Sequence, residues 1–291
     1  MSASADLGPG RPGPEGTRRR SPLWRRVLRS PRGGFGVVVT TLLFVLGALA
    51  PLLAPTDPFA IEGPPLSAPS RANPFGTDAL GRDLLSGVIF GARTSLLVAV
   101  TVALIVVVIG VAVGLLAGYV GGWVDDVLMR VTELFQVLPR FFLALVVIAF
   151  FGPGIDRLVL VLGITSWPLL ARVLRAETLS LREREFVEAA EVIGSSQRRI
   201  MLREILPNAL PPGIALLGLV VAQVILIEAS LGFLGLGDPD VTSWGALASE
   251  AQRFLRVAWW LSLFPGLAIL LAVLGLNLLG DAVTDALSGR R

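Results

Sequence analysis

The chain has 291 residues, of which 54% are hydrophobic and 16% are charged, with a formal net charge of +3 and a mean hydropathy of +0.75. This composition lies outside the range of soluble domains and predicts an integral membrane protein. There is no cysteine and no histidine, and all 25 basic residues are arginine. These absences exclude a Ser-His triad, a thiol nucleophile, a typical zinc site and a lysine-containing phosphate loop. We therefore expect no metal ion, no cofactor and no nucleic-acid partner.

Residues 1–34 form an arginine-rich segment that cannot bury enough apolar surface to fold alone. Their composition predicts disorder as far as about Thr17. From Ser21 onward, the stretch SPLWRRVLRS predicts a short amphipathic helix on an anionic cytoplasmic membrane surface. A plain charge cluster that only orients the chain explains the same arginines equally well. The apolar side of the helix would carry Leu23, Trp24, Val27 and Leu28, and the polar side Arg25, Arg26 and Arg29.

Six apolar segments predict an all-α membrane protein with six transmembrane helices within residues 35–291. A helix needs about 20 apolar residues to cross a hydrocarbon layer of about 30 Å. The fourth segment is short for a span, and the third contains charged residues. The predicted spans are residues 35–54, 95–120, 131–151, 158–174, 210–232 and 257–280.

The arginines predict the orientation of these spans, because loops rich in basic residues stay on the cytoplasmic side. With the N-terminus inside, eighteen arginines lie on the cytoplasmic side and six lie outside, with Arg140 set aside within the third span. Most of the eighteen lie in the N-terminal tail and between the fourth and fifth spans. The sequence therefore predicts that both termini are cytoplasmic.

Two predicted outer segments, 55–94 and 233–256, are long enough to have structure of their own. In the first, Thr77 is a suitable N-cap for a short amphipathic helix that would lie against the outer membrane face. The apolar positions of that helix would be Leu80, Leu84, Leu85, Val88 and Ile89. The second segment carries tryptophans typical of the aromatic belt at a membrane interface, and these are Trp244, Trp259 and Trp260.

The second predicted span contains small residues at every fourth position, namely Gly110, Gly114 and Gly118. Such a ladder lets the backbone of another helix approach closely. Helix packing is the preferred interpretation, and a smooth face that slides during gating is the alternative.

Arg140 follows a proline near the centre of the third predicted span. There an arginine costs about 2.5–3.5 kcal/mol to insert, so its side chain must face protein or water. A structural ion pair with Glu133 or Glu228 is preferred to contact with a transported substrate. Gln223 and Asn277 also have two interpretations, with hydrogen bonding between helices favoured over lining of a pathway.

Residues 177–208 predict a charged helix–turn–helix between the fourth and fifth spans. A helix over residues 181–192 is broken at Gly194, and either of the two following serines can cap a second short helix that Pro207 ends. A plain connecting loop explains the charges but not the apolar residues or the glycine. The pattern therefore favours a docking surface for a soluble partner.

The same stretch resembles the EAA loop of bacterial ABC importer permeases in both residue types and spacing. The matching residues are Glu188, Ala189, Ala190, Gly194, Leu206 and Pro207. One departure is Glu204, which stands where the family motif commonly has isoleucine.

Several further stretches resemble the C-type second permease subunit of dipeptide, oligopeptide and nickel importers. They include NPFGTDALGRDLLSGVIFGARTSL, EASLGFLGLG, SWGALASEA and LNLLGDAVTDAL, and the resemblance covers about residues 35–287. It implies the type I ABC importer permease fold, with a coupling hairpin at 177–208, in the bacterial cytoplasmic membrane. It is specific for the family and much less specific for the substrate.

The resemblance also implies that the chain works within a complex. Its partners would be a second permease subunit, in a heterodimer, two cytoplasmic ABC ATPase subunits and an extracytoplasmic substrate-binding protein. The chain itself would be non-catalytic and would form half of a pathway for short peptides or a related small solute. The EAA-loop residues would couple that pathway to ATP hydrolysis. Arg140 departs from the apolar residue that is usual after this proline in the family.

Two other function classes compete with this one. A self-sufficient secondary transporter would use Arg140, Glu133 and Glu228 as a charge relay, but the sequence shows no internal inverted repeat. An intramembrane aspartyl protease would match GLGD at residues 235–238, but Asp238 lies in a predicted outer loop and has no second buried aspartate to pair with.

Overall fold

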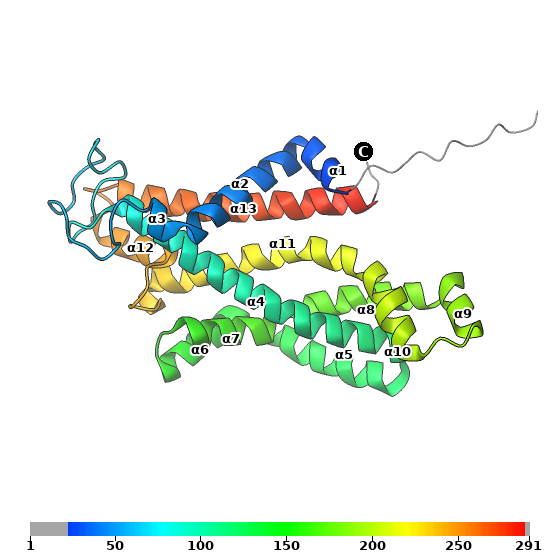
Figure 1. Ribbon diagram of the computed structural model, residues 1–291. Coiled ribbons are helices and arrows are strands. Elements are labelled where there is room, and N and C mark those ends of the chain that lie inside the picture. Colours follow the sequence, from blue (N-terminus) through cyan, green and yellow to red (C-terminus); the bar gives the residue numbers. More distant parts are fainter. Residues whose placement is uncertain (1–22, 289–291) are drawn as a thin grey trace, which may run out of the picture.

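The structure, a computed structural model, describes residues 23–288 and is built from helices (Figure 1). Over this range it contains no β-strand, and two isolated bridges occur in the segment before residue 84. The all-α prediction is therefore confirmed. The predicted disorder up to Thr17 falls outside the described residues.

The first half of the described chain contains the long helix α4 and the shorter helices before and after it. These are α1 (Leu23–Arg29), α2 (Pro31–Ala48), α3 (Ala50–Leu53), α4 (Leu84–Val120), α5 (Gly122–Val137), α6 (Arg140–Phe151) and α7 (Ile155–Ser166). The second half contains α8 (Pro168–Arg182), α9 (Glu185–Val192), α10 (Gln197–Arg199), η1 (Ile200–Ile205), α11 (Leu206–Leu231), η2 (Gly232–Leu236), α12 (Trp244–Ala251), η3 (Gln252–Phe254) and α13 (Trp260–Ser288).

Five helical segments of the described chain are long and apolar enough to cross a membrane, and counting the bent pair α5–α6 as one span gives six. The number agrees with the prediction. Most helices extend beyond the predicted limits, because the chain stays helical through its polar ends. The fourth span runs through α7 and α8 as Ile155–Arg182, and the fifth runs as Gln197–Leu236.

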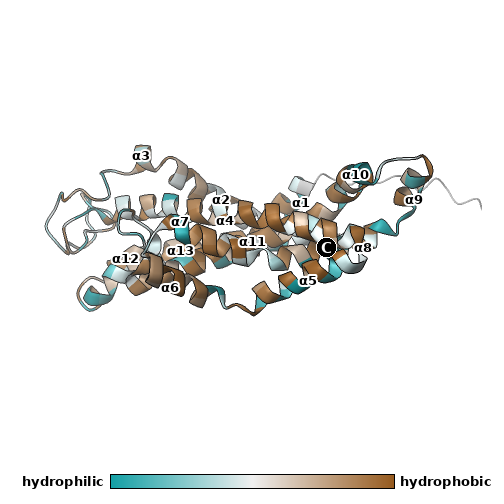
Figure 2. Cartoon of the chain, turned by 90° about the horizontal axis from the view of Figure 1, so that it is seen from below, coloured by the Kyte–Doolittle hydropathy of each residue, from teal (hydrophilic) through white to brown (hydrophobic). Residues whose placement is uncertain are grey.

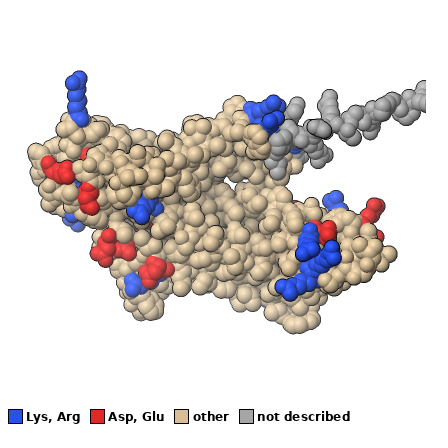
Figure 3. All heavy atoms as spheres, in the orientation of Figure 1, with Lys and Arg blue, Asp and Glu red and all other residues tan. Residues whose placement is uncertain are grey.

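The bundle is elongated, with distinct structure at its two ends. The helices α1, α9 and α10 and the C-terminal part of α13 lie at one end, which we call the hairpin end, whereas α12 and residues 54–83 lie at the other, the α12 end (Figure 1). The hydrophobic residues are concentrated between these ends (Figure 2). Acidic and basic side chains gather towards the two ends of the visible face (Figure 3).

The separate amphipathic helix predicted after Thr77 does not form. Thr77 instead forms an isolated bridge with Asp83, and its hydroxyl donates to the Pro64 carbonyl at 2.7 Å. Asp83 is the true N-cap, and its carboxylate accepts a hydrogen bond from the Ser86 backbone N–H at 2.8 Å. The helix that begins at Leu84 continues for 37 residues as α4, which is about 55 Å at 1.5 Å per residue. Of the apolar positions assigned to a surface helix, Leu84, Leu85, Val88 and Ile89 therefore begin a membrane span, and Leu80 lies in the turn before it.

The third predicted span is broken rather than continuous. The helices α5 and α6 are bent by 73° relative to each other. Leu138 and Pro139 form the break, both with extended backbone, because a proline ring cannot fit inside a continuing helix. The break places Arg140 at the first position of α6 instead of in mid-helix.

Pro207 does not end a helix, contrary to the prediction. It lies at the start of α11, directly after the π-helical turn η1, and the chain stays helical from Gln197 to the end of α11 at Leu231. Proline is tolerated in the first turn of a helix because its missing N–H would have no helical partner there. The wider π-helical turn lets the preceding segment continue directly into the span.

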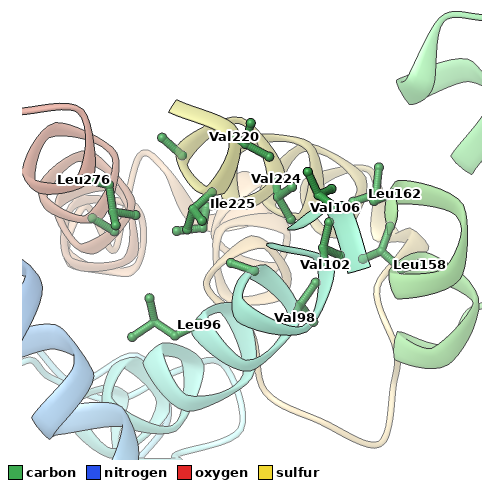
Figure 4. Close-up of a cluster of buried hydrophobic side chains, with 14 of the residues drawn as sticks. Leu96, Val98, Val102, Val106, Leu158, Leu162, Val220, Val224, Ile225 and Leu276 are labelled. Carbon is green, nitrogen blue, oxygen red and sulfur yellow. The ribbon is translucent and has the colours of Figure 1, made fainter. Parts of the chain in front are cut away.

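The main hydrophobic core forms where α4 meets α7, α8 and α11, and Figure 4 shows the part of it that α4, α7, α11 and α13 build. Leu162, Val102 and Val106 of this cluster are fully buried. The surface of the bundle is also apolar, with Leu104 and Val108 of α4 about two-thirds exposed. An apolar surface around an apolar core is what a bilayer, rather than water, requires.

Two of the three predicted interfacial tryptophans are core residues instead. Trp244 is fully buried and donates its indole N–H to the Val88 carbonyl at 2.9 Å. Its ring fits against Gly91, where an added Cβ would lie 2.7 Å from the indole. Trp260 is 5% exposed and donates to the Thr77 carbonyl at 3.2 Å. Trp259 alone is exposed and remains compatible with the interfacial belt.

The contact between α4 and α8 depends on the absence of a side chain at Gly114. A Cβ at this position would lie 2.5 Å from the Ala171 carbonyl oxygen and 2.8 Å from the Leu174 Cβ. Gly114→Leu should therefore separate the two helices. We expect it to lower the free energy of unfolding by about 1–3 kcal/mol, the loss typical of overpacking. The measurement is the thermal unfolding midpoint of the purified protein in detergent. Gly266→Leu is the matched control, because a Cβ added at Gly266 would meet nothing within 4 Å; equal losses in both variants would contradict the prediction.

Candidate functional site

The helix α5 presents a polar face at the surface of the described chain. Asp126, Arg130, Glu133 and Gln136 are all exposed and lie three or four residues apart, so they occupy one half of the helix. We call these four residues the polar track. Charged groups inside a span are costly in contact with lipid and usually face a partner or a water-filled cavity. The polar track is therefore a candidate wall of an aqueous pathway.

Arg140 continues from the polar track beyond the break between α5 and α6. Its guanidinium donates from Nη1 to the Gln223 Oε1 of α11, at a long distance of 3.4 Å. The predicted ion pair is not formed: within residues 23–288, neither Glu133 nor Glu228 pairs with Arg140. The preferred sequence interpretation is therefore wrong about the partner, although Gln223 does form a contact between helices.

Glu133 and Glu228 have different surroundings. Glu133 is well exposed and lies 3.9 Å from Arg130, a weak pair on one helix face. Glu228 is 5% exposed, and its Oε2 accepts a hydrogen bond from the Ser95 hydroxyl at 2.8 Å. That bond joins α11 to α4 near the α12 end. The charge relay that a secondary transporter would need is therefore not assembled, because Glu133 is exposed and Glu228 is buried elsewhere.

Asn277 lies on α13, away from the polar track, and its side-chain amide donates to the Val273 carbonyl one turn earlier at 2.8 Å. It lines a cleft of about 300 Å³ between α8, α11 and α13. Asp281 and Thr284 lie in the same cleft. No interhelical hydrogen bond of Asn277 occurs in the described chain.

The glycine ladder of α4 faces α8 along its length. Besides Gly114, a Cβ at Gly110 would lie 3.0 Å from the Leu170 side chain, and one at Gly118 would lie 2.7 Å from the Thr178 Cβ. The three glycines therefore mark a line of close backbone approach. This geometry is that of tight helix packing.

The charged segment between the fourth and fifth spans folds into a hairpin at the end of the bundle. The helix α8 ends at Arg182, α9 follows after a short break, and Gly194 turns the chain with a φ of +77°. Ser196 occupies the N-cap position of α10, but its side chain makes no capping hydrogen bond. Glu188 and Ala189 are exposed on α9, and Ala190 is half-buried.

The hairpin has a small hydrophobic core of its own that is shared with the end of α4. Val187, Ile200 and Ile205 are almost completely buried against Leu115 of α4. Leu206 packs against the same cluster, whereas Pro207 starts the span that follows. The hairpin is thus attached to the bundle by burial rather than left as a free loop.

The tip of the hairpin is apolar and exposed. Val192 is 88% exposed and Ile193 is 79% exposed, immediately before the turn at Gly194. Phe186, on the same short helix, is also exposed. Adjacent exposed apolar side chains with charged neighbours are typical of a docking surface.

Polar contacts between distant segments hold the hairpin against α4 and join α8 to α5. Arg182 donates to the Tyr119 carbonyl at 2.9 Å, and the Tyr119 hydroxyl donates to Gln197 of α10. Arg172 donates to Gln136 of the polar track at 3.0 Å. These contacts join residues far apart in the chain, and no local motif indicates them.

Arg175 and Asp125 form a bidentate ion pair between α8 and the start of α5, with two N···O distances of 2.5 Å. Arg175 lies just beyond the predicted end of the fourth span at residue 174, where the sequence predicts a cytoplasmic connection. Because α8 extends to Arg182, the residue lies in a helix that packs on α4. The side chains of the pair are 33% and 13% exposed, which protects it partly from screening.

The α12 end contains a cavity of about 320 Å³ between residues 58–87 and 232–250. Asp238, the residue of the GLGD match, lines it and accepts a hydrogen bond from the backbone N–H of Ile155 at 3.2 Å. It therefore caps the start of α7 and has no catalytic geometry. Burial raises the pKa of the Glu250 carboxyl in the same cavity, and the nearby Asp78 raises it further, while Arg82 lowers it.

Comparison with known proteins gives one consistent set of matches. A family model described as "Binding-protein-dependent transport system inner membrane component" matches residues 110–291. The dipeptide transport system permease protein DppC of Escherichia coli (strain K12) is 42% identical over 273 residues, which are 91% of each chain. The oligopeptide transport system permease protein OppC of Salmonella typhimurium is 41% identical and covers 91% of this chain and 90% of its own.

A more distant bacterial relative and a solved structure agree with these matches. DppC of Alkalihalophilus pseudofirmus is 35% identical over 286 residues, which are 96% of this chain and 94% of that protein. A chain of the inward-facing MetNI methionine ABC transporter superposes with a TM-score of 0.54 at 19% identity, covering 70% of this chain and 97% of that one. At this identity the superposition shows a shared fold.

The ion pair between Arg175 and Asp125 should stabilise the hairpin end more than the exposed pair between Arg130 and Glu133. Arg175→Met leaves Asp125 partly buried without a partner, so we expect a loss of about 1–3 kcal/mol. Arg130→Met should cost well under about 1 kcal/mol. The thermal unfolding midpoint measures both, and the Asp125→Asn variant completes a double-mutant cycle with Arg175→Met. Equal shifts for the Arg175 and Arg130 variants would contradict the assignment.

Proposed function

The chain belongs to the family of binding-protein-dependent transport system inner membrane components, and on that premise we propose that it imports short peptides or a related small solute with energy from a separate ATPase. It is a multi-pass permease subunit of the cytoplasmic membrane. The substrate class is supported by relatives named for dipeptide and oligopeptide transport, which match the chain over more than nine-tenths of its length.

We propose that the hairpin at 177–208 docks onto a cytoplasmic ATPase subunit. The observation that supports this most is the exposed apolar tip, at Val192 and Ile193, on a hairpin that is otherwise anchored by its own core. An anchored hairpin can transmit force, whereas a free loop cannot. In this proposal Glu188 offers a charged contact, Ala189 and Ala190 allow close approach, and Gly194 makes the bend.

The remaining partners follow from the same role. A second permease subunit would complete the pathway in a heterodimer, because one chain presents its polar track on an open surface. Two ATPase subunits would bind the two hairpins, and an extracytoplasmic substrate-binding protein would deliver the solute to the α12 end. Both termini and the hairpin would then be cytoplasmic, as the arginine distribution predicts.

We propose that the polar track and Arg140 line the pathway. Among residues 23–288, Arg140 has one hydrogen-bond partner, the neutral Gln223 at 3.4 Å, so its charge remains available to a passing solute. Glu228, in contrast, is buried with Ser95 and is assigned a packing role. Gln223 holds the arginine in place between α6 and α11. Asn277, on α13, lies in a separate cleft and is not assigned to the pathway.

The alternative of a self-sufficient secondary transporter is not favoured. Its supposed charge relay is not assembled in the described residues, and the relatives are permeases of binding-protein-dependent systems. The purified chain alone should therefore show no uptake driven by an ion gradient.

Gly194 provides a direct test of the coupling role. Its φ of +77° is strained for a β-branched residue, while asparagine tolerates this conformation. Gly194→Val should leave membrane abundance unchanged but reduce peptide uptake and receptor-stimulated ATP hydrolysis by about tenfold or more, since a few kcal/mol of strain is enough to distort the turn. Gly194→Asn is the control and should retain most activity. Normal peptide uptake by the valine variant would contradict the coupling proposal.

Arg140→Leu tests the pathway role against a structural role. If the guanidinium meets the solute, the variant should assemble normally but change the relative uptake of acidic and neutral peptides by about tenfold, which corresponds to about 1.4 kcal/mol. Competition uptake assays in proteoliposomes measure this ratio. Gln223→Leu removes the neighbouring amide and should change the ratio much less. Lower abundance of Arg140→Leu with an unchanged ratio would identify a purely structural residue.

A further inference from the structure

An apolar groove lies at the hairpin end of the bundle, between α1, α2 and the last turns of α13. It has a volume of about 340 Å³. The residues that line it are Trp24, Val27, Leu28, Val37, Val283 and Ala286. A groove of this size lies within the range of small-ligand sites, and its lining offers no polar partner to a ligand.

The groove has firm walls, because α1 is fastened to α13 by packing and hydrogen bonding. Val27 is buried against Ala282 and Ala286. Arg26 donates from Nη1 to the Ala286 carbonyl at 3.3 Å, which also places a positive charge at the C-terminal end of α13. Ser30 accepts a hydrogen bond from the Gly33 N–H at 3.0 Å and so fixes the angle between α1 and α2.

The helix α1, which forms one wall of the groove, is strongly basic. Arg25, Arg29 and Arg32 are exposed on or next to α1, and Arg25 lies over the Trp24 ring at 5.0 Å from its centroid. A basic cluster is visible at this end of the bundle (Figure 3). The helices α1 and α2 contain no acidic residue, and α13 adds Asp281 and Asp285. Three further arginines, at positions 18–20, directly precede this segment in the sequence.

We propose that this groove binds one anionic phospholipid, with an acyl chain in the groove and the phosphate against Arg25, Arg29 and Arg32. The chemistry fits this occupant, because an apolar groove and exposed arginines are combined on one short helix, as an acyl tail and an anionic headgroup are combined in one lipid. The helix α2, which contributes Val37 to the groove, also has exposed apolar residues, and the neighbouring Val38 is 64% exposed. A lipid can therefore enter sideways from the bilayer. The site does not depend on which solute is transported, and only its assignment to the cytoplasmic leaflet rests on the proposed orientation.

Binding of phosphatidylglycerol by the full-length chain in detergent tests the proposal, with dioleoyl phosphatidylcholine as a probe that has the same tails and no net charge. Native mass spectrometry gives the apparent affinity for each lipid. We expect a preference of about tenfold or more for dioleoyl phosphatidylglycerol, because each arginine near an anionic surface adds roughly a fivefold gain. Equal affinity for the two lipids would overturn the proposal.

Two variants separate the headgroup site from the tail site. Replacing Arg25, Arg29 and Arg32 together by glutamine should abolish the preference but leave phosphatidylcholine binding unchanged. Leu28→Gln, at a half-exposed position in the groove, should weaken both lipids by about the same factor. Arg71→Gln, at an exposed position in the segment at the α12 end, is the matched control and should change neither. Unchanged phosphatidylglycerol binding in the triple variant, or in Leu28→Gln, would overturn the proposal.

Folding and self-association are monitored in the same samples. Circular dichroism checks that the triple variant keeps its helices. If it does not fold, the single variant Arg29→Gln replaces it and should reduce the preference for phosphatidylglycerol over phosphatidylcholine a few-fold. If a concentration-dependent dimer forms and is lost in Leu28→Gln while lipid binding is unaffected, a second copy of the chain occupies the groove and the proposal is wrong. Since the assay needs no transport, its outcome is independent of the result of the peptide uptake experiments.

Discussion

The close contact between α4 and α8 is the constraint on which the rest of the structure depends. It is possible only because Gly110, Gly114 and Gly118 carry no side chain where the two backbones meet. In a membrane, where lipid is as apolar as the helix surface, this close van der Waals packing replaces the hydrophobic effect as the source of helix association. The contact brings Arg175 to Asp125, and it places the end of α4 where the hairpin can bury its own small core.

Polar groups within the bundle are arranged in two different ways. Buried ones are satisfied locally, as with Glu228 and Ser95 or Trp244 and the Val88 carbonyl, because an unpaired polar group in an apolar interior is costly. The polar track of α5 is exposed on the surface beside a break in the helix, and of its four residues Gln136 is hydrogen-bonded to another helix, through Arg172. Buried polar groups therefore hold the helices together, whereas most of the polar track stays open to a partner subunit or a solute.

The number of spans and the position of the hairpin turn could be predicted from the sequence, because both depend on local signals: hydrophobic runs and a glycine between two helical segments. Contacts between distant segments could not. Thr77 and Asp83 are both suitable N-caps, and only tertiary packing selects Asp83. In the sequence, Trp244 has the position of an interfacial tryptophan. In the fold it is buried in the core, because Gly91 leaves space for its ring. The partner of Arg140 is likewise a distant amide rather than either carboxylate that the sequence suggested.

The prolines of the fifth span are confined to one region of a long helix. Pro207, Pro211 and Pro212 all lie near the start of α11, and the π-helical turn η1 directly precedes them, whereas no proline interrupts the remainder as far as Leu236. Missing backbone hydrogen bonds lower the resistance of a helix to bending. We therefore expect flexure at the prolines beside the hairpin and at the kink at Gly235, whose φ is +78°, with the stretch from Gly213 to Leu231 moving as one unit between them. Beyond the kink, Asp238 is bonded to the first turn of α7.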